Sequence, residues 1–338
     1  MVLSDVDGIM RLVLVGREGK RHDYFLKACR EKGVELLFLD IEGNFEEGNL
    51  HRGDRVKIDP VSNDTIYLDQ LNRNMQEYHG YLKRLSVVGG VHFLNSPVSI
   101  KATLDKRRCK RILKEKGILV TPILDFYGFS FEDLMEYLRR ERISRIFIKP
   151  NLGSGAAGVA SLKYNPKLDV CIMQTSLLKQ EGYVNTKKVR TFTDRASIRE
   201  MVDFLLKEGA VVERWIPKEA VGQAVYDLRV VYQFSHISYI QARGAKTSAI
   251  TNLHLNNFPL TMGEIGLTEE KKMELEELCA NAMACFDGLN SAGFDILLEK
   301  NTEKPYIIEI NAQGDLMHRD VYGENRIYKE QVERMIRG

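Results

Sequence analysis

The sequence has 338 residues, which is enough for two or three packed units. Its apolar and charged fractions, 44% and 28%, are those of a globular protein that dissolves in water. The net charge of +2 gives no argument for binding nucleic acid or an anionic membrane, and no apolar run approaches the ~20 residues that cross a bilayer. The five cysteines form no CxxC pair and the start of the chain lacks a signal-peptide pattern, so we expect a cytoplasmic protein with reduced thiols.

The sequence pattern of residues 1–95 predicts a small α/β unit. Short apolar runs with the length and composition of buried strands occupy residues 11–16, 35–40 and 54–59. Segments with the periodicity of amphipathic helices occupy residues 22–32 and 68–84. This alternation of strand and helix is typical of a doubly wound parallel sheet. The loop from Gly16 to Gly19 after the first strand is interpreted as an ordinary turn between strand and helix.

A helix is expected to begin after Ser96, because serine caps helices and Pro97 is favoured at the first helical position. This helix or a second one continues to residue 116 and carries a run of basic residues, namely Lys106, Arg107, Arg108, Lys110 and Arg111. Most of these charges fit a solvated helix face. Lys106 is kept apart as a candidate ligand-binding residue.

A glycine-rich loop from Gly153 to Gly158 matches the pattern GxGxxG, which alone is weak evidence for a nucleotide site. A dinucleotide-binding fingerprint requires a helix that starts inside the loop, whereas the residues that follow are strand-like as far as Pro166. A glycine flap between antiparallel strands fits better, since glycine lets backbone N–H groups approach phosphate oxygens closely. Lys149, just before the loop, can place an ammonium on the same phosphates. The alternative is a flexible loop that binds nothing.

Two arginines are candidates for binding an anion. If the strands at 226–234 and 237–242 form a hairpin that turns at His236, Arg229 lies opposite Arg243. Two facing guanidinium groups need an anion between them, and phosphate matches arginine geometry. This register is an assumption, and the alternative is that both arginines form ion pairs with Asp227 and Glu219.

The stretch 292–311 predicts a hairpin in which Asp295 lies directly across from Glu309. Asn311 shares their face because it follows Glu309 by two residues. Like charges that face each other across strands are destabilising, and a divalent cation between them removes the repulsion. Oxygen ligands of this kind suit Mg²⁺. The alternative is a surface hairpin whose acidic residues face water.

These pieces stand in the order found in a known superfamily. The chain resembles the ATP-grasp proteins, most closely their RimK-like carboxylate–amine ligase branch, between about residues 95 and 314. The fragments that carry the resemblance are Asp105-Lys106, residues 148–159 (IKPNLGSGAAGV), 211–216 (VVERWI), 227–231 (DLRVV), 243–255 (RGAKTSAITNLHL), 292–298 (AGFDILL) and 306–311 (YIIEIN).

The resemblance implies an α/β fold of the ATP-grasp type, with a small parallel α/β domain at residues 1–95. Two α+β subdomains, at 96–212 and 213–338, would clasp ATP between two antiparallel sheets. The stretch 163–195 is longer than this family usually needs, and we expect it to add a hairpin with Lys187, Lys188 and Arg190. This hairpin could touch a substrate or be a structural elaboration.

The resemblance also implies a role for each matching residue. ATP phosphates would be contacted by Lys106, Lys149 and the flap residues Gly153, Ser154, Gly155 and Gly158. Adenine would meet Glu213 and the backbone of Arg214, Trp215 and Ile216, and the ribose would meet Asp227. The residues expected at the reacting groups are Arg229, Arg243 and Asn252. One or two Mg²⁺ ions, with Mn²⁺ as an alternative, would be held by Asp295, Glu309 and Asn311.

The activity that the resemblance implies is ATP-dependent formation of an amide through an acyl phosphate, with ADP as a product. The substrate would be an amino acid or a peptide, with no nucleic acid or membrane partner, and a homo-oligomer is left open. Ala312-Gln313-Gly314 stands where similar ligases often have proline and glycine, which leaves the shape of the acceptor side open. A small-molecule kinase and a non-catalytic nucleotide-binding protein are the alternatives.

Overall fold

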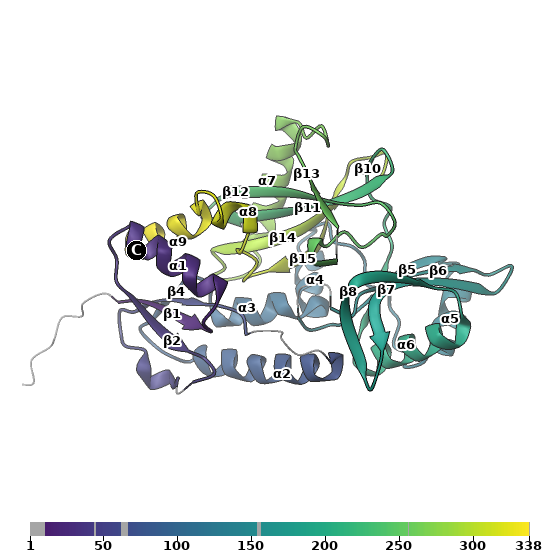
Figure 1. Cartoon of the computed structure of the whole chain (residues 1–338), viewed down its shortest axis with the longest axis horizontal. Coiled ribbons are helices and arrows are strands. Elements are labelled where there is room, and N and C mark those ends of the chain that lie inside the picture. Colours follow the sequence, from purple (N-terminus) through teal and green to yellow (C-terminus); the bar gives the residue numbers. More distant parts are fainter. Residues whose placement is uncertain (1–10, 44, 62–66, 154–156, 256, 338) are drawn as a thin grey trace, which may run out of the picture.

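The computed structural model describes residues 11–43, 45–61, 67–153, 157–255 and 257–337 (Figure 1). Three sheets organise these residues. The first is parallel, with the strand order β2-β1-β3-β4, and the other two are antiparallel. This arrangement confirms the expected fold class. Among the helices of the described ranges, none is long and apolar enough to cross a membrane.

The N-terminal unit is built on the parallel sheet. Its strands are β1 (Leu12–Gly16), β2 (Leu36–Asp40), β3 (Arg55–Ile58) and β4 (His92–Phe93), and its helices are α1 (Lys20–Glu31), η1 (Glu47–Asn49) and α2 (Leu68–Leu85). Alternate residues of β1 point to opposite faces, so Leu12 packs in a cluster with Phe25 and Tyr328, and Val13 packs with Leu68. The sheet is therefore covered on both faces, as a doubly wound parallel sheet requires.

The last helix of the chain, α9 (Arg326–Arg337), belongs spatially to this first unit. It lies beside α1 on one face of the parallel sheet, although the two helices are far apart in the sequence (Figure 1). The N-terminal unit is thus joined to the C-terminal part of the chain by a packed helix pair.

Two consecutive helices lead out of the N-terminal unit. Ser96 caps α3 (Pro97–Leu104), with its side chain accepting a hydrogen bond from the Ser99 N–H at 3.2 Å. Asp105 has an extended backbone, which ends α3, and its carboxylate caps α4 (Lys106–Glu115) by accepting from the Arg108 N–H at 2.9 Å. Lys106 is therefore the first residue of a new helix, and its backbone N–H donates to Asn151 O at 3.0 Å, beside the glycine flap.

The second sheet has the order β8-β7-β6-β5-β9. Its strands are β5 (Arg145–Lys149), β6 (Ala160–Asn165), β7 (Val170–Lys179), β8 (Tyr183–Phe192) and β9 (Val211–Arg214). The extra hairpin expected within 163–195 is β7–β8. Helices α5 (Phe131–Arg140) and α6 (Arg195–Lys207) pack on this sheet. The boundary expected between residues 212 and 213 falls inside β9, so we propose that the second unit extends to Arg214.

The third sheet has the order β13-β12-β11-β14-β15, with β10 added to β11. Its strands are β10 (Ala220–Val221), β11 (Ala224–Gln233), β12 (His236–Ala245), β13 (Phe258–Leu260), β14 (Ser291–Leu298) and β15 (Pro305–Asn311). The helices of this part are η2 (Leu253–Leu255), α7 (Glu269–Met283) and α8 (His318–Val321). Helix α7 packs on β11 and β12, and the sheet lies beside the second sheet and above the N-terminal unit (Figure 1).

Candidate functional site

A cavity of about 460 Å³ lies between the two antiparallel sheets. The second sheet contributes Phe147 and Lys149 to its wall, and the chain after β9 contributes Ile216. Polar side chains of the third sheet line the cavity from four adjacent strands, namely Asp227, Arg229, Gln241, Arg243, Asp295, Glu309 and Asn311. The expected residues Asn252, Glu213 and Arg214 also line it.

The two acidic residues of the β14–β15 hairpin face each other as the sequence predicts. Asp295 is the direct partner of Glu309 in the antiparallel ladder, and Asn311 pairs with Gly293. A bulge between Asp295 and Ile296 interrupts strict alternation, so Ile296 pairs with Ile307 in the core while Ile308 and Glu309 both line the cavity. The predicted carboxylate–carboxylate–amide face is confirmed in its geometry and opens into the cavity.

Two arginines flank Asp295. Arg229 Nη1 lies 2.6 Å from Asp295 Oδ1, and Arg243 Nη2 lies 3.2 Å from Asp295 Oδ2. Burial alone would raise the pKa of Asp295, but Arg243 and Arg229 bring the pKa below its usual value. Asp295 is therefore held as a carboxylate at neutral pH, and the repulsion from Glu309 is offset by these guanidinium groups.

The expected pairing of Arg229 with Arg243 is wrong. Arg243 pairs with Asp227, and Arg229 pairs with Gln241, two positions away from the expected register. The hairpin turns at Phe234 and Ser235, which both have positive φ, and a bulge follows at Val231 and Tyr232. Turns of this kind usually contain glycine or asparagine, and neither residue type stands at these two positions.

A shift of two residues keeps both arginines on the cavity face, where carboxylates separate them. Arg243 Nε donates to Asp227 Oδ1 at 2.7 Å, and Lys218 Nζ donates to Asp227 Oδ2 at 3.1 Å. Thr251 also donates its hydroxyl proton to Asp227. Burial raises the pKa of Asp227, but Arg243 and Lys218 outweigh this effect and hold the pKa well below its usual range. Its expected contact with ribose stays a prediction.

Lys149 is held by the buried carboxylate of Glu213. Its Nζ donates to Glu213 Oε2 at 2.6 Å, and Lys110 Nζ donates to Glu213 Oε1 at 2.5 Å. Burial raises the pKa of Glu213, but Lys110 and Lys149 outweigh it and bring the pKa to about 2. Glu213 is 1% exposed and its carboxylate binds two ammonium groups, so its expected contact with adenine stays a prediction.

Sequence reasoning missed Lys110, which was grouped with the solvated charges of its helix. Lys110 is 5% exposed and donates to both oxygens of Thr121, at 2.6 Å to Oγ1 and 3.1 Å to the backbone carbonyl. Burial lowers its pKa to about 8 although Glu213 opposes the fall. The signal was available, since Lys106, Lys110 and Leu113 follow the spacing of one helix face.

The base of the glycine flap is held by Lys106. Its Nζ donates to Gly153 O at 2.6 Å and lies 3.9 Å from Glu309 Oε2, which links the flap to the acidic pair. At the other end, Gly158 has φ of 68° and donates its N–H to Asn185 Oδ1 at 3.2 Å. Ser154 and Gly155 lie outside the described residues. Lys106, Gly153 and Gly158 are not part of the cavity wall formed by the described residues.

The segment 214–216 meets the cavity only in part. The backbone N–H of Arg214 donates to Pro122 O at 2.9 Å, and that of Trp215 donates to Arg145 O at 3.3 Å. These two backbone N–H groups thus already donate to carbonyl groups of the protein. The Trp215 ring packs on Phe147 with centroids 5.0 Å apart. Arg214 and Ile216 line the cavity and are the residues of this segment that can meet a ligand there.

The acidic face fits a magnesium ion. Within the described part of the chain, no group of three His, Cys, Asp or Glu residues is placed to hold a metal, so the candidate set is the mixed one of Asp295, Glu309 and Asn311. A carboxylate oxygen accepts two hydrogen bonds or ligands, and each oxygen of Asp295 has one guanidinium partner. The donors are all oxygens, which suits Mg²⁺.

Further cavity residues come from outside the predicted site. Arg21 enters from α1, and the segment that follows β15 contributes Leu316, Met317, His318 and Arg319. The pattern of the turn before Arg21 is that of an ordinary turn between strand and helix, and Asp315, which pairs with Arg21, lies 294 residues away in the sequence.

Comparisons with known proteins agree with this architecture. Among solved structures, the D-cycloserine synthetase DcsG has a TM-score of 0.63 at 14% identity, over 96% of this chain and 99% of that chain. A RimK domain protein ATP-grasp from Sphaerobacter thermophilus has a TM-score of 0.57 at 13% identity, over 97% and 100%. The D-alanine–D-alanine ligase from Bacillus anthracis, complexed with ATP, has a TM-score of 0.56 at 13% identity, over 97% of each chain.

At these identities the solved structures establish the fold alone. A search of curated protein sequences found no match. The sequence model of the YheC/D like ATP-grasp family matches residues 95–337, which includes the flap, the arginines and the acidic hairpin. The chain belongs to the YheC/D like ATP-grasp family.

Proposed function

We propose that the protein is an ATP-dependent ligase that joins a carboxylate to an amine and forms ADP. The observation that carries the proposal is the acidic pair Asp295 and Glu309, which faces the same cavity as Arg229, Arg243 and Lys149. Family membership and the similarity of the fold to a D-alanine–D-alanine ligase complexed with ATP support it. The two sheets would enclose the nucleotide between them.

ATP would lie with its base toward the apolar side chains of Phe147 and Ile216 and its phosphates toward the cationic Lys149 and Arg243, all of which line the cavity. The flap would cover the phosphates, and Lys106 would fix the base of the flap. Asp295, Glu309 and Asn311 would hold Mg²⁺. When bound, this ion neutralises charge on the triphosphate and withdraws electrons from the transferred phosphoryl group.

The chemistry requires no covalent enzyme nucleophile. An oxygen of the substrate carboxylate attacks the γ-phosphorus while the bond from phosphorus to the ADP oxygen breaks, which gives an acyl phosphate. The nitrogen of the second substrate then attacks the acyl carbon, the bond from that carbon to the phosphate oxygen breaks, and the amine loses a proton. Arg229 and Arg243 would stabilise the negative charge that develops in both steps, because their guanidinium groups are fixed before the substrate arrives.

The carboxylate and amine substrates would be amino acids or peptides. The test is an assay of ADP release over free amino acids and dipeptides, with the product mass determined for every pair that releases ADP. A product whose mass equals the two substrates minus water, together with free phosphate, supports a ligase. A product that retains the phosphoryl group indicates a kinase instead, and the absence of both nucleotide binding and ADP release would contradict any ATP-dependent function.

A further inference from the structure

One end of the cavity is basic, and the expected contacts with ATP do not account for it. We call this end the basic end and define it by Arg21, His318 and Arg319, with Tyr239 beside them. Arg21 comes from the N-terminal unit, whereas His318 and Arg319 open α8. Three parts of the chain that are distant in sequence therefore place their polar side chains in one region of the cavity wall.

The basic end lies beyond the acidic pair, on the side away from Ile216. Along β12 the cavity is lined by alternate residues, first Arg243, then Gln241 and then Tyr239. Four residues of a strand span roughly 13 Å, so Tyr239 is well separated from Arg243 and its partner Asp227. Arg319 lies near Tyr239, where its charge counteracts the effect of burial on the tyrosine, whose pKa is raised by that burial.

The backbone just after the acidic hairpin connects the basic end to the reacting groups. Arg229 Nη2 donates to Gly314 O at 3.1 Å, and Arg21 Nη2 donates to Gln313 O at 2.9 Å. The two guanidinium groups thus bind consecutive carbonyls of the segment that follows Asn311. A substrate that reaches from Arg229 toward Arg21 would pass directly along this segment.

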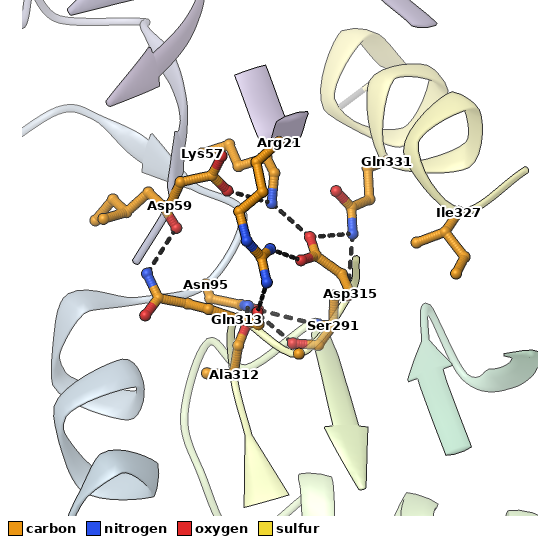
Figure 2. Close-up of polar contacts among 12 residues, drawn as sticks. Arg21, Lys57, Asp59, Asn95, Ser291, Ala312, Gln313, Asp315, Ile327 and Gln331 are labelled. Atoms are coloured by element: carbon orange, nitrogen blue, oxygen red, sulfur yellow. Dashed lines mark hydrogen bonds and ion pairs between the residues drawn. The ribbon is translucent and has the colours of Figure 1, made fainter. Parts of the chain in front are cut away.

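Arg21 is fixed in place and still has hydrogen-bonding capacity. Its Nη1 lies 2.5 Å from Asp315 Oδ1, and the other oxygen of Asp315 accepts from Lys57 at 2.5 Å and from Gln331 at 3.2 Å (Figure 2). The side chain of Arg21 is 24% exposed, and the cavity is where it reaches open space. A guanidinium group has five N–H donors, and the two contacts with Asp315 and Gln313 use two of them.

No acidic residue of the cavity wall pairs with the basic end, and the carboxylate that Arg21 binds, Asp315, lies outside this wall and is shared with Lys57. The acidic residues that line the cavity are Glu213, Asp227, Asp295 and Glu309, and each has a basic partner outside the basic end. In the described ranges of the chain, no ion pair is formed by Arg319, which is exposed. Burial, Lys20 and Arg21 lower the pKa of His318, which is what a positively charged surrounding produces.

The geometry points to a carboxylate-binding subsite at the basic end, formed by Arg21 and Arg319, for the amine-bearing substrate. This substrate is then an amino acid or a peptide with a free carboxylate close to its amine, and not an uncharged amine. The inference rests on the proposed ligase function and gives the class of its second substrate. Arginine suits this role because its planar donors match both oxygens of a carboxylate.

The first experiment measures binding to the whole chain loaded with Mg²⁺ and a non-hydrolysable ATP analogue. Free amino acids, their carboxamides and inorganic phosphate are titrated separately by calorimetry. We expect at least one amino acid to bind, and its carboxamide to bind at least tenfold more weakly. Equal binding of an acid and its amide, no binding of any amino acid, or binding of inorganic phosphate alone would overturn the subsite.

The second experiment uses Arg319→Gln, because Arg319 is exposed and its loss leaves no buried carboxylate without a partner. We expect this variant to lose about tenfold or more in affinity for the amino acid and to bind the carboxamide as the wild type does. Arg111→Gln, which removes an exposed arginine from α4, is the matched control and should change neither affinity. A variant at Arg319 that weakens acid and amide equally would contradict the assignment.

Arg21→Lys tests the second arginine, since lysine keeps a positive charge beside the buried Asp315. We expect weaker binding of the amino acid and unchanged affinity for the ATP analogue. The ATP analogue also separates the ligase proposal from the subsite proposal. If the analogue binds but no pair of substrates releases ADP from ATP, the ligase proposal fails, while the titrations with amino acids and their carboxamides still test the subsite.

Discussion

Asp295 lies directly across from Glu309 in the β14–β15 ladder. Glu309→Gln keeps the shape of this pair but removes the charge that would attract Mg²⁺. We expect ADP formation to fall by about 10²-fold or more, and the Mg²⁺ concentration for half-maximal activity to rise, since such electrostatic contacts carry a large part of catalysis. The measurement is ADP release at a series of Mg²⁺ concentrations.

The matched control for this variant is Glu303→Gln, at the exposed turn of the same hairpin. It removes the same charge from the turn between the two strands, away from the cavity wall. Its activity and Mg²⁺ dependence should equal those of the wild type. If Glu309→Gln also retains full activity, the acidic pair is not the metal site.

Gly314 leaves room for the guanidinium group of Arg229. A Cβ at Gly314 would lie 2.5 Å from Arg229 Nη2 and 2.9 Å from Gly293 Cα, closer than real contacts allow. Gly314→Ala should therefore displace Arg229 and reduce kcat by about 10²-fold, the order of loss caused by a misplaced catalytic group. Gly263→Ala is the control, because a Cβ there meets no heavy atom within 4 Å. Equal kcat values for the two variants would show that Arg229 is not needed in this position.

The facing positions of Asp295 and Glu309 could be predicted from sequence because a short polar turn joins their strands, although a bulge interrupts the ladder between Asp295 and Ile296. The β11–β12 register could not, since it depends on positive φ at Phe234 and Ser235 and on a bulge that no residue type announces. The face of each strand was nevertheless correct, because a shift of two residues preserves it. Local pattern thus identified which side chains enter the site but not which of them pair.

Residues whose role depends on tertiary contacts were harder to find. The buried position of Lys110 follows from its contacts with Thr121 and Glu213, which the local charge pattern conceals. The helix break at Asp105 accompanies its bridge to Leu152 and the hydrogen bond that it accepts from Asn151. Arg21 is an extreme case, because its partner Asp315 lies 294 residues away. The match to ATP-grasp motifs covers the nucleotide side of the cavity and contains no information about this contact.

The buried charges beneath the cavity join the N-terminal unit to the rest of the chain (Figure 2). Lys57 is 3% exposed and lies 2.5 Å from Asp315 and 3.1 Å from Asp59. Lys57→Met leaves Asp59 buried without this cation, so we expect the free energy of unfolding to fall by about 3–5 kcal/mol. Lys27→Met, which breaks an exposed pair with Glu31 in the same unit, should cost less than about 1 kcal/mol. The measurement is the free energy of unfolding of both variants by chemical denaturation at pH 7. Equal decreases in the two variants would contradict a stabilising role for the buried ion pairs of Lys57.

The contact between Glu213 and Lys149 also predicts how stability depends on pH. The pKa of Glu213 is about 2 in the folded protein, against 4.5 for an ordinary glutamate. Because the folded-state pKa is depressed, the stabilisation is fully present above pH 4.5 and is lost as the pH falls toward 2. The difference corresponds to about 3 kcal/mol.

Glu213→Gln should therefore have a lower free energy of unfolding than the wild type at pH 7. The difference between the two should shrink by about 3 kcal/mol between pH 5 and pH 2, because only the wild type has a carboxylate whose contribution is lost on protonation. The measurement is the free energy of unfolding in urea across this range. Glu270→Gln, at an exposed position of α7, should follow the wild-type curve throughout. If the difference in unfolding free energy between Glu213→Gln and the wild type stayed constant over this range, the ion pairs of Glu213 with Lys110 and Lys149 would not stabilise the fold. Lys149 would then be held in position for the phosphates by other contacts.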